Sequence, residues 1–191
     1  CVQWTEADHE ANIRRALAHY ASLNPRRASA LLETTAGQRE IDISSLNALE
    51  VVDLWYPWDP AAPVYPPPRP PYSMLDDATL LLESDAPPAG GSTDGLRLFY
   101  LAPHTIQGLD GATVTTLDAS GEALIILLAT AAAAMQRCQS TIGRVTVSNW
   151  TPGQLLEWAQ ARQAQAEAAC EALRRRLASA QDARVAWDER V

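Results

Sequence analysis

The residues of this chain best suited to acid–base or nucleophilic chemistry are its histidines and cysteines, three of each. The histidines are scattered, and none has an acidic or thiol partner at a spacing typical of a catalytic site. His9 and His19 fall on a predicted helix, which favours a solvated or half-buried role. His104, just after a predicted strand, is the strongest candidate, but a turn-stabilising or subunit-contact role is favoured over catalysis.

The cysteines Cys1, Cys138 and Cys170 are far apart and odd in number. No CxxC pair and no Cys/His pattern of a metal site occurs among them. The sequence therefore predicts reduced, mostly buried thiols. We expect no catalytic metal, no other cofactor and no redox disulfide.

The pair Asp76-Asp77 is the remaining candidate for metal chemistry. Neighbouring residues of an extended chain face opposite ways, and no third ligand is near in sequence, so a capped turn is the favoured interpretation. Nucleophile-elbow, zincin, dinucleotide-binding and EF-hand motifs are absent from the sequence. All 15 basic residues are arginine, which excludes lysine-based catalysis. We expect no catalytic residues and a protein that is not an enzyme.

The composition is that of a chain able to form one well-packed domain, since it has 191 residues, of which 47% are hydrophobic. Its net charge of -8 argues against a general nucleic-acid binder, because affinity for phosphates comes from clustered cations. The longest apolar run, residues 123–135, is broken only by Thr130. It is shorter than the roughly 20 residues that span a membrane, and it predicts a buried helix, covered on all sides by this chain or by a neighbouring subunit.

Three helices are predicted from capping residues and periodicity. Thr5 caps a helix over about 5–22, which ends at Asn24-Pro25 because the residue before proline avoids helical geometry. Asp118 caps a second helix that reaches about residue 140. The segment 151–154, with Thr, Pro, Gly and Gln, begins a third helix that runs to about residue 180.

Between the first two helices, residues 28–102 are expected to form a β-rich insertion. Alternation and β-branched residues predict antiparallel strands at 31–35, 40–44, 50–56, 79–83 and 96–101, with a turn at 87–95. Residues 57–71 contain eight prolines, which predicts an extended surface arm. The predicted fold is therefore α+β: a single domain, 1–191, with a three-helix core and this insertion.

Aromatic residues surround the proline arm: Trp55, Tyr56, Trp58, Tyr65 and Tyr72. Aromatic and proline side chains give rigid contact area at low entropic cost, which is typical of a protein-contact surface. A loop folded back over its own sheet and a carbohydrate-binding platform are the alternatives.

A second candidate contact lies towards the C-terminus. The apolar stripe of the third helix fades after Leu177, yet Trp187 follows, so we predict that residues 181–191 form a docking tail. Folding back of Trp187 on its own helix, or fraying, is the alternative. The arginine run 174–176 either pairs with a neighbour or forms a solvated face. The predicted interface with partner proteins is the set Trp55, Trp58, Tyr65, Arg174, Arg175, Arg176 and Trp187.

Three short segments carry a family resemblance. They are residues 13–20 ending in 24–27, the strand that reaches Tyr56-Pro57, and residues 98–100 running into 102–105. Together with the order of one helix, a β-rich insertion and two helices, they resemble head–tail connector adaptors of tailed phages. The resemblance implies a ring, commonly of twelve subunits, beneath the portal, which continues the DNA channel. The long proline arm and the sizeable sheet depart from small family members, which are nearly all helical.

The resemblance implies a structural virion protein at the head–tail junction, present in the host cytoplasm during assembly. Its partners would be other copies of itself, the portal protein and other neck or tail proteins, with DNA only as passing cargo and no membrane. Another neck, tail-completion or baseplate protein is the first alternative. A cellular peptide- or carbohydrate-binding module is the second. A hydrolase with a dispersed site would depend on His104 or on Asp76-Asp77.

Overall fold

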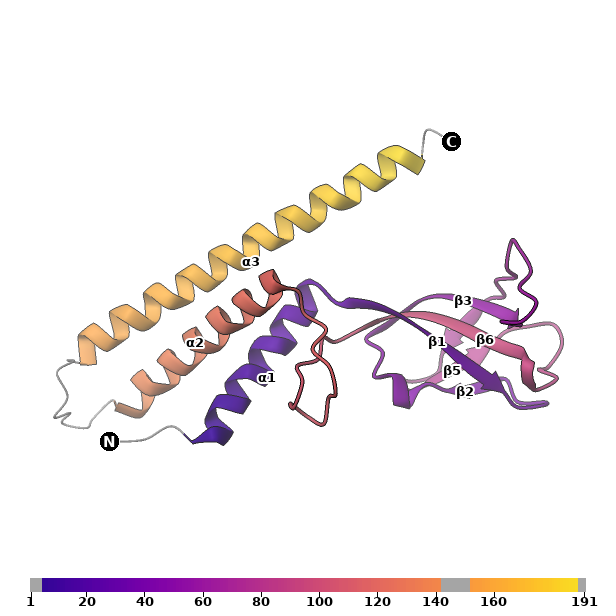
Figure 1. Ribbon diagram of the computed structural model, residues 1–191, viewed down its shortest axis with the longest axis horizontal. Coiled ribbons are helices and arrows are strands. Elements are labelled where there is room, and N and C mark those ends of the chain that lie inside the picture. Colours follow the sequence, from indigo (N-terminus) through magenta and orange to yellow (C-terminus); the bar gives the residue numbers. More distant parts are fainter. Residues whose placement is uncertain (1–4, 142–151, 189–191) are drawn as a thin grey trace. The chain divides into compact units, whose positions relative to one another are not determined.

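The computed structural model describes residues 5–141 and 152–188, with the side chains of 179–188 and of a few other positions left out. The chain forms two compact units (Figure 1). A helical unit combines Cys1–Asn24 with His104–Val191, and a β-rich unit, Pro25–Pro103, is inserted between them. The mixed α+β class is confirmed. That the whole chain behaves as a single domain stays a prediction.

The helical unit contains α1 (Glu6–Leu23), α2 (Ala119–Thr141) and α3 (Pro152–Asp188). Thr5 and Asp8 form a capping box at α1, as the sequence predicts. The Gly121 N–H donates to the Asp118 carboxylate at 2.7 Å and so caps the start of α2. The predicted end of the third helix near residue 180 is wrong, because α3 continues to Asp188. Residues 180–188 contain neither glycine nor proline, so loss of the apolar stripe does not end the helix.

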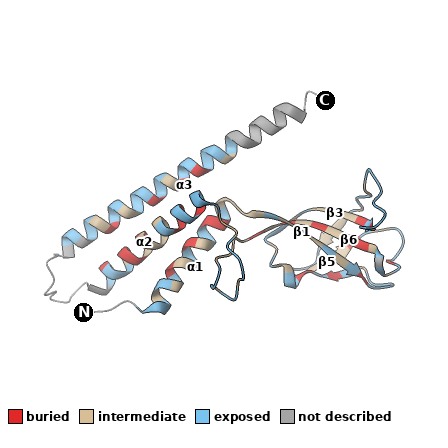
Figure 2. Ribbon diagram, in the orientation of Figure 1, coloured by how far each residue is buried: buried red, intermediate tan, exposed pale blue. Residues whose placement is uncertain are grey.

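The core of the helical unit lies where α2 packs against α1 and α3. Its larger cluster joins Tyr20 of α1, Leu124 and Ile125 of α2, and Cys170 and Leu173 of α3. Figure 2 shows the buried residues on the facing sides of these helices. Cys138 and Cys170 are buried, as expected, whereas Cys1 lies outside the described residues.

Helix α2 is only partly covered by its own chain. The stretch Ala119–Gln139 is, among the described helices, the one long and apolar enough to cross a membrane by length and composition, a test that core helices of soluble proteins also pass. Only 33% of that stretch is buried. Within one chain α1 and α3 cover two sides of α2 and leave Ile126 67% exposed, so cover of the remaining side by a neighbouring subunit stays a prediction.

The β-rich unit contains two antiparallel three-stranded sheets. Sheet A has the order β1-β6-β3, with β1 Arg26–Thr34, β6 Gly91–Ala102 and β3 Glu50–Trp58. Sheet B has the order β2-β5-β4, with β2 Glu40–Asp42, β5 Thr79–Leu82 and β4 Tyr72–Met74. A short 3-10 helix, Ser44–Leu46, follows β2.

Three details of this unit differ from the sequence prediction. Strand β4 was not predicted, because its three residues follow the prolines and carry no alternation signal. Strand β6 begins at Gly91, inside the predicted turn 87–95, and β1 begins at Arg26 instead of residue 31. In both cases pairing between β1 and β6, which matches Arg26 with Ala102 and Thr34 with Gly91, extends the strands beyond their apolar residues.

The inner faces of the two sheets enclose a second core. Leu54, Leu96 and Leu98 of sheet A and Leu80 and Leu82 of sheet B have at most 1% of their surface exposed. Because side chains alternate along a strand, the residues between these leucines must point to the opposite, outer face of sheet A. That outer face carries the aromatic residues described next.

Candidate interaction surface

The outer face of sheet A presents an aromatic cluster built on β3 and β6. Trp55 is paired with Arg97, and Phe99 lies two residues further along β6 on the same face. The register shifts between Trp55 and Trp58, so that three residues of β3 span only two of β6 and Trp58 joins Trp55 on this face. We call Trp55, Trp58, Tyr65, Arg97 and Phe99 the aromatic face.

The rings of the aromatic face contact one another and surround the guanidinium of Arg97. The centroid of Trp55 lies 5.0 Å from that of Trp58 and 4.6 Å from that of Phe99. The Arg97 Cζ atom lies 5.3 Å from the Trp55 centroid, 5.4 Å from the Trp58 centroid and 5.3 Å from the Phe99 centroid. Such cation–π contacts hold the guanidinium in place without consuming its hydrogen-bond donors.

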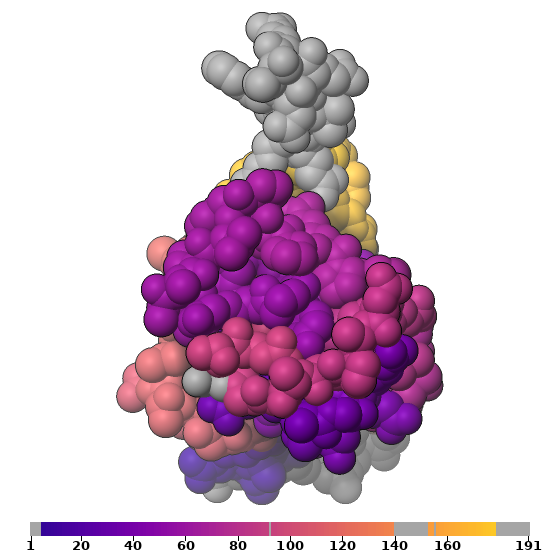
Figure 3. Space-filling view, turned by 90° about the vertical axis from the view of Figure 1, so that its right-hand side faces the viewer, coloured from indigo at the N-terminus to yellow at the C-terminus, as the bar shows by residue number. Residues whose placement is uncertain are grey.

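The proline-rich segment folds back towards this face. The Tyr56 N–H donates to the Pro68 carbonyl at 3.1 Å, and Arg69 forms an ion pair with Asp53 at 3.4 Å. Tyr65 lies edge-on to Trp58, with centroids 5.9 Å apart. The segment is therefore tied to its own sheet at Pro68, Arg69 and Tyr65, while residues 61–66 are exposed. Figure 3 shows the surface of the β-rich unit in violet to magenta.

The three aromatic residues proposed for an interface have different accessibility. Trp58 is only 4% exposed, because Tyr65 and Arg97 contact it, whereas Tyr65 is 68% exposed. Trp55 is half-buried, and its indole N–H donates to Asp53 at 3.0 Å. A partner would therefore touch Tyr65 and the edge of Trp55, with Trp58 supporting them. Their role as an interface stays a prediction.

A hydrogen-bond network around Asp94 was not predicted from the sequence. The Asp94 carboxylate accepts hydrogen bonds from the Tyr56 hydroxyl at 2.9 Å and from the Ala89 N–H at 2.7 Å. Burial, together with this carboxylate, raises the pKa of Tyr56 to about 12. The sequence gives little indication of this network, because Asp94 lies in a stretch rich in Gly, Ser and Pro.

His104 has the turn-stabilising role that the sequence favours. Its Nε2 lies 3.0 Å from the Asn24 carbonyl oxygen, and its Nδ1 lies 3.3 Å from the Thr116 hydroxyl. Nδ1 also lies 3.2 Å from the Thr116 carbonyl oxygen. Its ring also lies edge-on to Tyr20, with centroids 5.2 Å apart. His104 thus connects the end of α1 with the loop that precedes α2.

One histidine–thiol contact was missed because its members are far apart in sequence. The Cys170 Sγ lies 3.7 Å from the His19 Nε2. Burial raises the pKa of the Cys170 thiol, which disfavours the reactive thiolate. Among the described residues, no group of three or more His, Cys, Asp or Glu side chains could hold a metal ion. The contact between His19 and Cys170 therefore does not supply a reactive thiolate.

The Asp76-Asp77 pair forms the predicted capped turn. The Ala78 N–H donates to the Asp76 carboxylate at 2.8 Å, and this hydrogen bond lowers the pKa of Asp76. The Leu75 N–H donates to the Thr79 carbonyl at 3.0 Å and closes the turn between β4 and β5. Asp77 is exposed and has no ion pair with any described residue.

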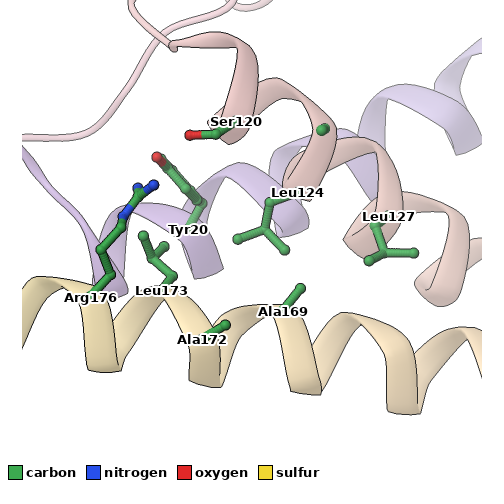
Figure 4. Close-up of a pocket in the computed structure, with 9 residues that line it drawn as sticks. Tyr20, Ser120, Leu124, Leu127, Ala169, Ala172, Leu173 and Arg176 are labelled. Carbon is green, nitrogen blue, oxygen red and sulfur yellow. The ribbon is translucent and has the colours of Figure 1, made fainter.

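The arginines 174–176 are exposed residues of α3. Arg174 and Arg175 contact Glu171 at 3.4 and 3.5 Å, which is a solvated arrangement of exposed ion pairs. Arg176 lies at one end of a cavity of about 370 Å³ between α2 and α3, close to Tyr20 (Figure 4). The backbone of Trp187 is helical, but its side chain lies outside the described residues. The interface role of these residues stays a prediction.

No protein-family model matches the chain, and no curated protein matches it. Among solved structures it is similar to a chain from the neck of a native GTA particle computed with C12 symmetry, at 15% identity over 78% of this chain and 79% of that chain, with a TM-score of 0.34. A chain from the neck of an empty GTA particle computed with C6 symmetry has 14% identity over 83% and 80%, with a TM-score of 0.31. A third, from the virion of a native gene transfer agent particle, has 16% identity over 82% and 78%, with a TM-score of 0.28. TM-scores this low do not define a family.

Proposed function

We propose that this chain is a structural protein of a phage-like particle, a neck subunit of the head–tail connector adaptor kind that works as an oligomeric ring. In this role the helices form the subunit core, and the exposed aromatic residues and the far end of α3 contact neighbouring subunits. The contribution to the particle is mechanical, and no residue carries out catalysis.

The uncovered side of α2 is the observation that carries the proposal. Ile126 is 67% exposed, and the neighbouring Ala123 is exposed as well, on a helix whose composition is that of a core helix. Apolar surface of this kind is costly in water, and in oligomeric proteins it is covered by other subunits. Burial of one isoleucine side chain contributes about 1.5–3 kcal/mol, so a repeated contact along α2 would favour assembly.

Helix α3 offers a second surface for assembly. It has 37 residues and so measures about 55 Å at ~1.5 Å per residue, while α2 has 23 residues and measures about 35 Å. A helix of this excess length cannot be covered along its whole extent by α2. The predicted docking tail, 181–191, falls on this excess, apart from the last residues.

The charge distribution fits DNA as passing cargo. The β-rich unit, Pro25–Pro103, contains 11 Asp and Glu residues and five Arg residues. A surface with this balance repels phosphates, so a channel built from it would let DNA slide instead of holding it. The portal protein and other neck proteins are the proposed partners, the head–tail junction is the proposed location, and twelve is the proposed copy number.

Imaging tests the proposal most directly. The full chain with a small affinity tag would be expressed in cells that produce the particle, and purified particles would be labelled through the tag. We expect label at the head–tail junction and, in averaged images, a ring docked on the portal. Label elsewhere on the particle would favour another neck, tail-completion or baseplate role. A stable monomer that never enters particles would contradict the proposal and favour a cellular binding module.

A variant of α2 tests the observation that carries the proposal. Ile126→Glu places a charge on the uncovered side without touching the core, so the variant should fold with unchanged helical circular dichroism and lose incorporation into particles. Gln163→Glu, which adds the same charge at an exposed position of α3, is the matched control. Normal incorporation of Ile126→Glu would show that this side of α2 is not a subunit contact.

A further inference from the structure

Arg97 carries a positive charge for which no described residue supplies a hydrogen-bond acceptor. Among the described residues, its guanidinium has no hydrogen bond and no carboxylate within ion-pair distance, and its contacts are with the rings of Trp55, Trp58 and Phe99. The other arginine near this surface, Arg69, is paired with Asp53. A guanidinium fixed by aromatic rings keeps its planar set of five donors free for a carboxylate.

The surroundings of Arg97 are apolar as well as cationic. Leu31, its pairing partner on β1, is 58% exposed, and Tyr65 is 68% exposed. A ligand that matches this surface therefore needs one carboxylate next to apolar side chains.

The turn between β4 and β5 has that composition. Met74 is 42% exposed and Leu75 is 52% exposed, and Asp77 follows within two residues. The neighbouring Asp76 is occupied, since it caps the Ala78 N–H, whereas the carboxylate of Asp77 has no ion pair with a described residue. The turn is a short, closed hairpin connection that carries both Leu75 and Asp77, whereas Met74 pairs with the buried Leu80 at the end of β4 and so points to the inner side of sheet B.

The two surfaces of one chain belong to opposite layers of the β-rich unit. Sheet B, which carries the turn, packs through Leu80 and Leu82 on the inner face of sheet A. Arg97 alternates with the buried Leu96 and Leu98 and so lies on the outer face. A contact between the turn and Arg97 therefore has to be made between two copies.

We propose that the outer face of sheet A binds the β4–β5 turn of a second copy of this chain, with Asp77 of that copy on Arg97 and with Leu75 against Tyr65 and Leu31. The proposal depends on one part of the proposed function, namely that copies of the chain assemble. The two contacting surfaces differ, so the contact is heterologous, and successive copies close into a ring or extend as a filament.

The charge balance favours a single carboxylate on an apolar segment over a polyanion such as DNA. Residues 25–103 contain 11 acidic and five basic residues, so a nucleic acid approaching Arg97 would be repelled by its surroundings. A single Asp on a turn brings one charge together with the apolar area that the aromatic face requires.

Charge reversal in the full chain tests the pair. Sedimentation velocity over a range of concentrations would compare wild type, Arg97→Glu, Asp77→Arg and the double variant. We expect each single reversal to weaken self-association by about tenfold or more, because like charges then meet, and we expect the double variant to recover most of it. Glu83→Arg makes the same charge change as Asp77→Arg on another exposed carboxylate and should have little effect.

A mixing experiment gives the sharpest outcome. Arg97→Glu and Asp77→Arg chains should each stay dissociated alone, and they should assemble when mixed, with the two chains alternating, which native mass spectrometry detects. Tryptophan fluorescence would verify that both variants keep the aromatic face.

Loss of association in both single variants without recovery in the double variant or in the mixture would overturn the pairing. Unchanged association in the single variants would overturn it too, and so would a wild-type chain that remains monomeric at every concentration. An intact ring in particles that carry Arg97→Glu would reject this contact while leaving the proposed function in place. Absence of the chain from particles would instead reject the proposed function.

Discussion

Asp94 shows at the scale of a residue how one carboxylate joins distant segments. It accepts hydrogen bonds from Tyr56 on β3 and from the N–H groups of Ala89 and Gly90 before β6, and its backbone carbonyl accepts from the Thr34 hydroxyl on β1 at 2.7 Å. Hydrogen bonds to a charged group contribute about 1.5–3 kcal/mol each. The proline-rich segment is therefore held at its base, which agrees with its folding back on the sheet.

The raised pKa of Tyr56 predicts a loss of stability at high pH. The unfolded tyrosine ionises near its ordinary pKa of 10.0, whereas the folded residue keeps its proton up to about 12. Its contribution is thus complete below pH 10 and is lost as the pH rises through 12. We expect the free energy of unfolding, measured with urea, to fall across this window, and to fall less in Tyr56→Phe.

The arginine-only composition simplifies this measurement. Because the chain contains no lysine, no ammonium group of a side chain titrates near pH 10. Burial also raises the pKa values of Tyr72 and Cys170, so the comparison with Tyr56→Phe isolates the part due to Tyr56. Tyr65→Phe, which removes an exposed tyrosine, serves as the control and should follow the wild-type curve. Identical pH profiles for Tyr56→Phe and wild type would show that the Asp94 network does not hold the neutral hydroxyl.

Gly121 illustrates, at the scale of an element, how helices α1 and α2 approach each other. A Cβ atom at this position would lie 2.8 Å from the Tyr20 hydroxyl oxygen and 3.0 Å from an Asp118 carboxylate oxygen. The first turn of α2 therefore contains a glycine because the side chain of Tyr20 occupies the space that a larger residue needs.

We predict that Gly121→Ala destabilises the helical unit. The gain in helix propensity is about 1 kcal/mol, but overpacking costs about 1–3 kcal/mol, so the net loss should be roughly 0.5–2 kcal/mol. Ser120→Ala, at the exposed neighbouring position, is the control and should lose only its hydrogen bond to Asp118. Thermal unfolding followed by circular dichroism measures both variants, and a stabilised Gly121→Ala would contradict the close approach.

The far end of α3 gives the second prediction at this scale. Among the described side chains, Leu177 is the last that packs in the helical unit, so a chain that stops after residue 180 should keep its fold and unfold within a few degrees of the full chain. If residues 181–191 form the docking tail, the shortened chain should fail to enter particles. A truncated chain that assembles as well as the full one would remove the docking role, and Trp187→Ala would separate the tryptophan from the rest of the segment.

The whole molecule has an uneven distribution of charge. The helical unit contains 12 acidic and ten basic residues, while the β-rich unit contains 11 and five, so most of the net charge of -8 belongs to the inserted unit. Surfaces near neutrality associate more readily than strongly charged ones. The helical unit is thus the part better suited to close packing between copies. Arg97 is an exception within the acidic β-rich unit, because it is a cation without a carboxylate partner among the described residues.

We predict that the two units unfold together, as the single-domain interpretation requires. Scanning calorimetry of the full chain should then show one transition whose calorimetric enthalpy equals the van't Hoff enthalpy. Leu98→Ala, in the core of the β-rich unit, should destabilise the protein by about 2–5 kcal/mol and shift the whole transition. Two transitions, of which only one moves in Leu98→Ala, would show that the units are separate domains.

Local sequence determined the positions of most elements. Thr5, Asp118 and Thr151-Pro152 mark helix starts because a capping side chain or a proline acts on the backbone within three or four residues. Alternating apolar residues located β2, β3 and β5 for the same reason, since the two-residue period is a local property. The α+β class followed from these elements, and the capped turn at Asp76 and the linking role of His104 were also within reach.

The tertiary structure alone decided which surfaces are covered. A bulge places Trp58 beside Trp55, the return of the proline-rich segment buries it under Tyr65, and α1 and α3 leave Ile126 exposed. Each of these outcomes depends on partners distant in sequence, as do the Asp94 network and the contact of His19 with Cys170. Residue type and spacing act over a few residues, whereas burial depends on what the rest of the chain brings alongside, and so the candidate interaction surfaces became visible only in three dimensions.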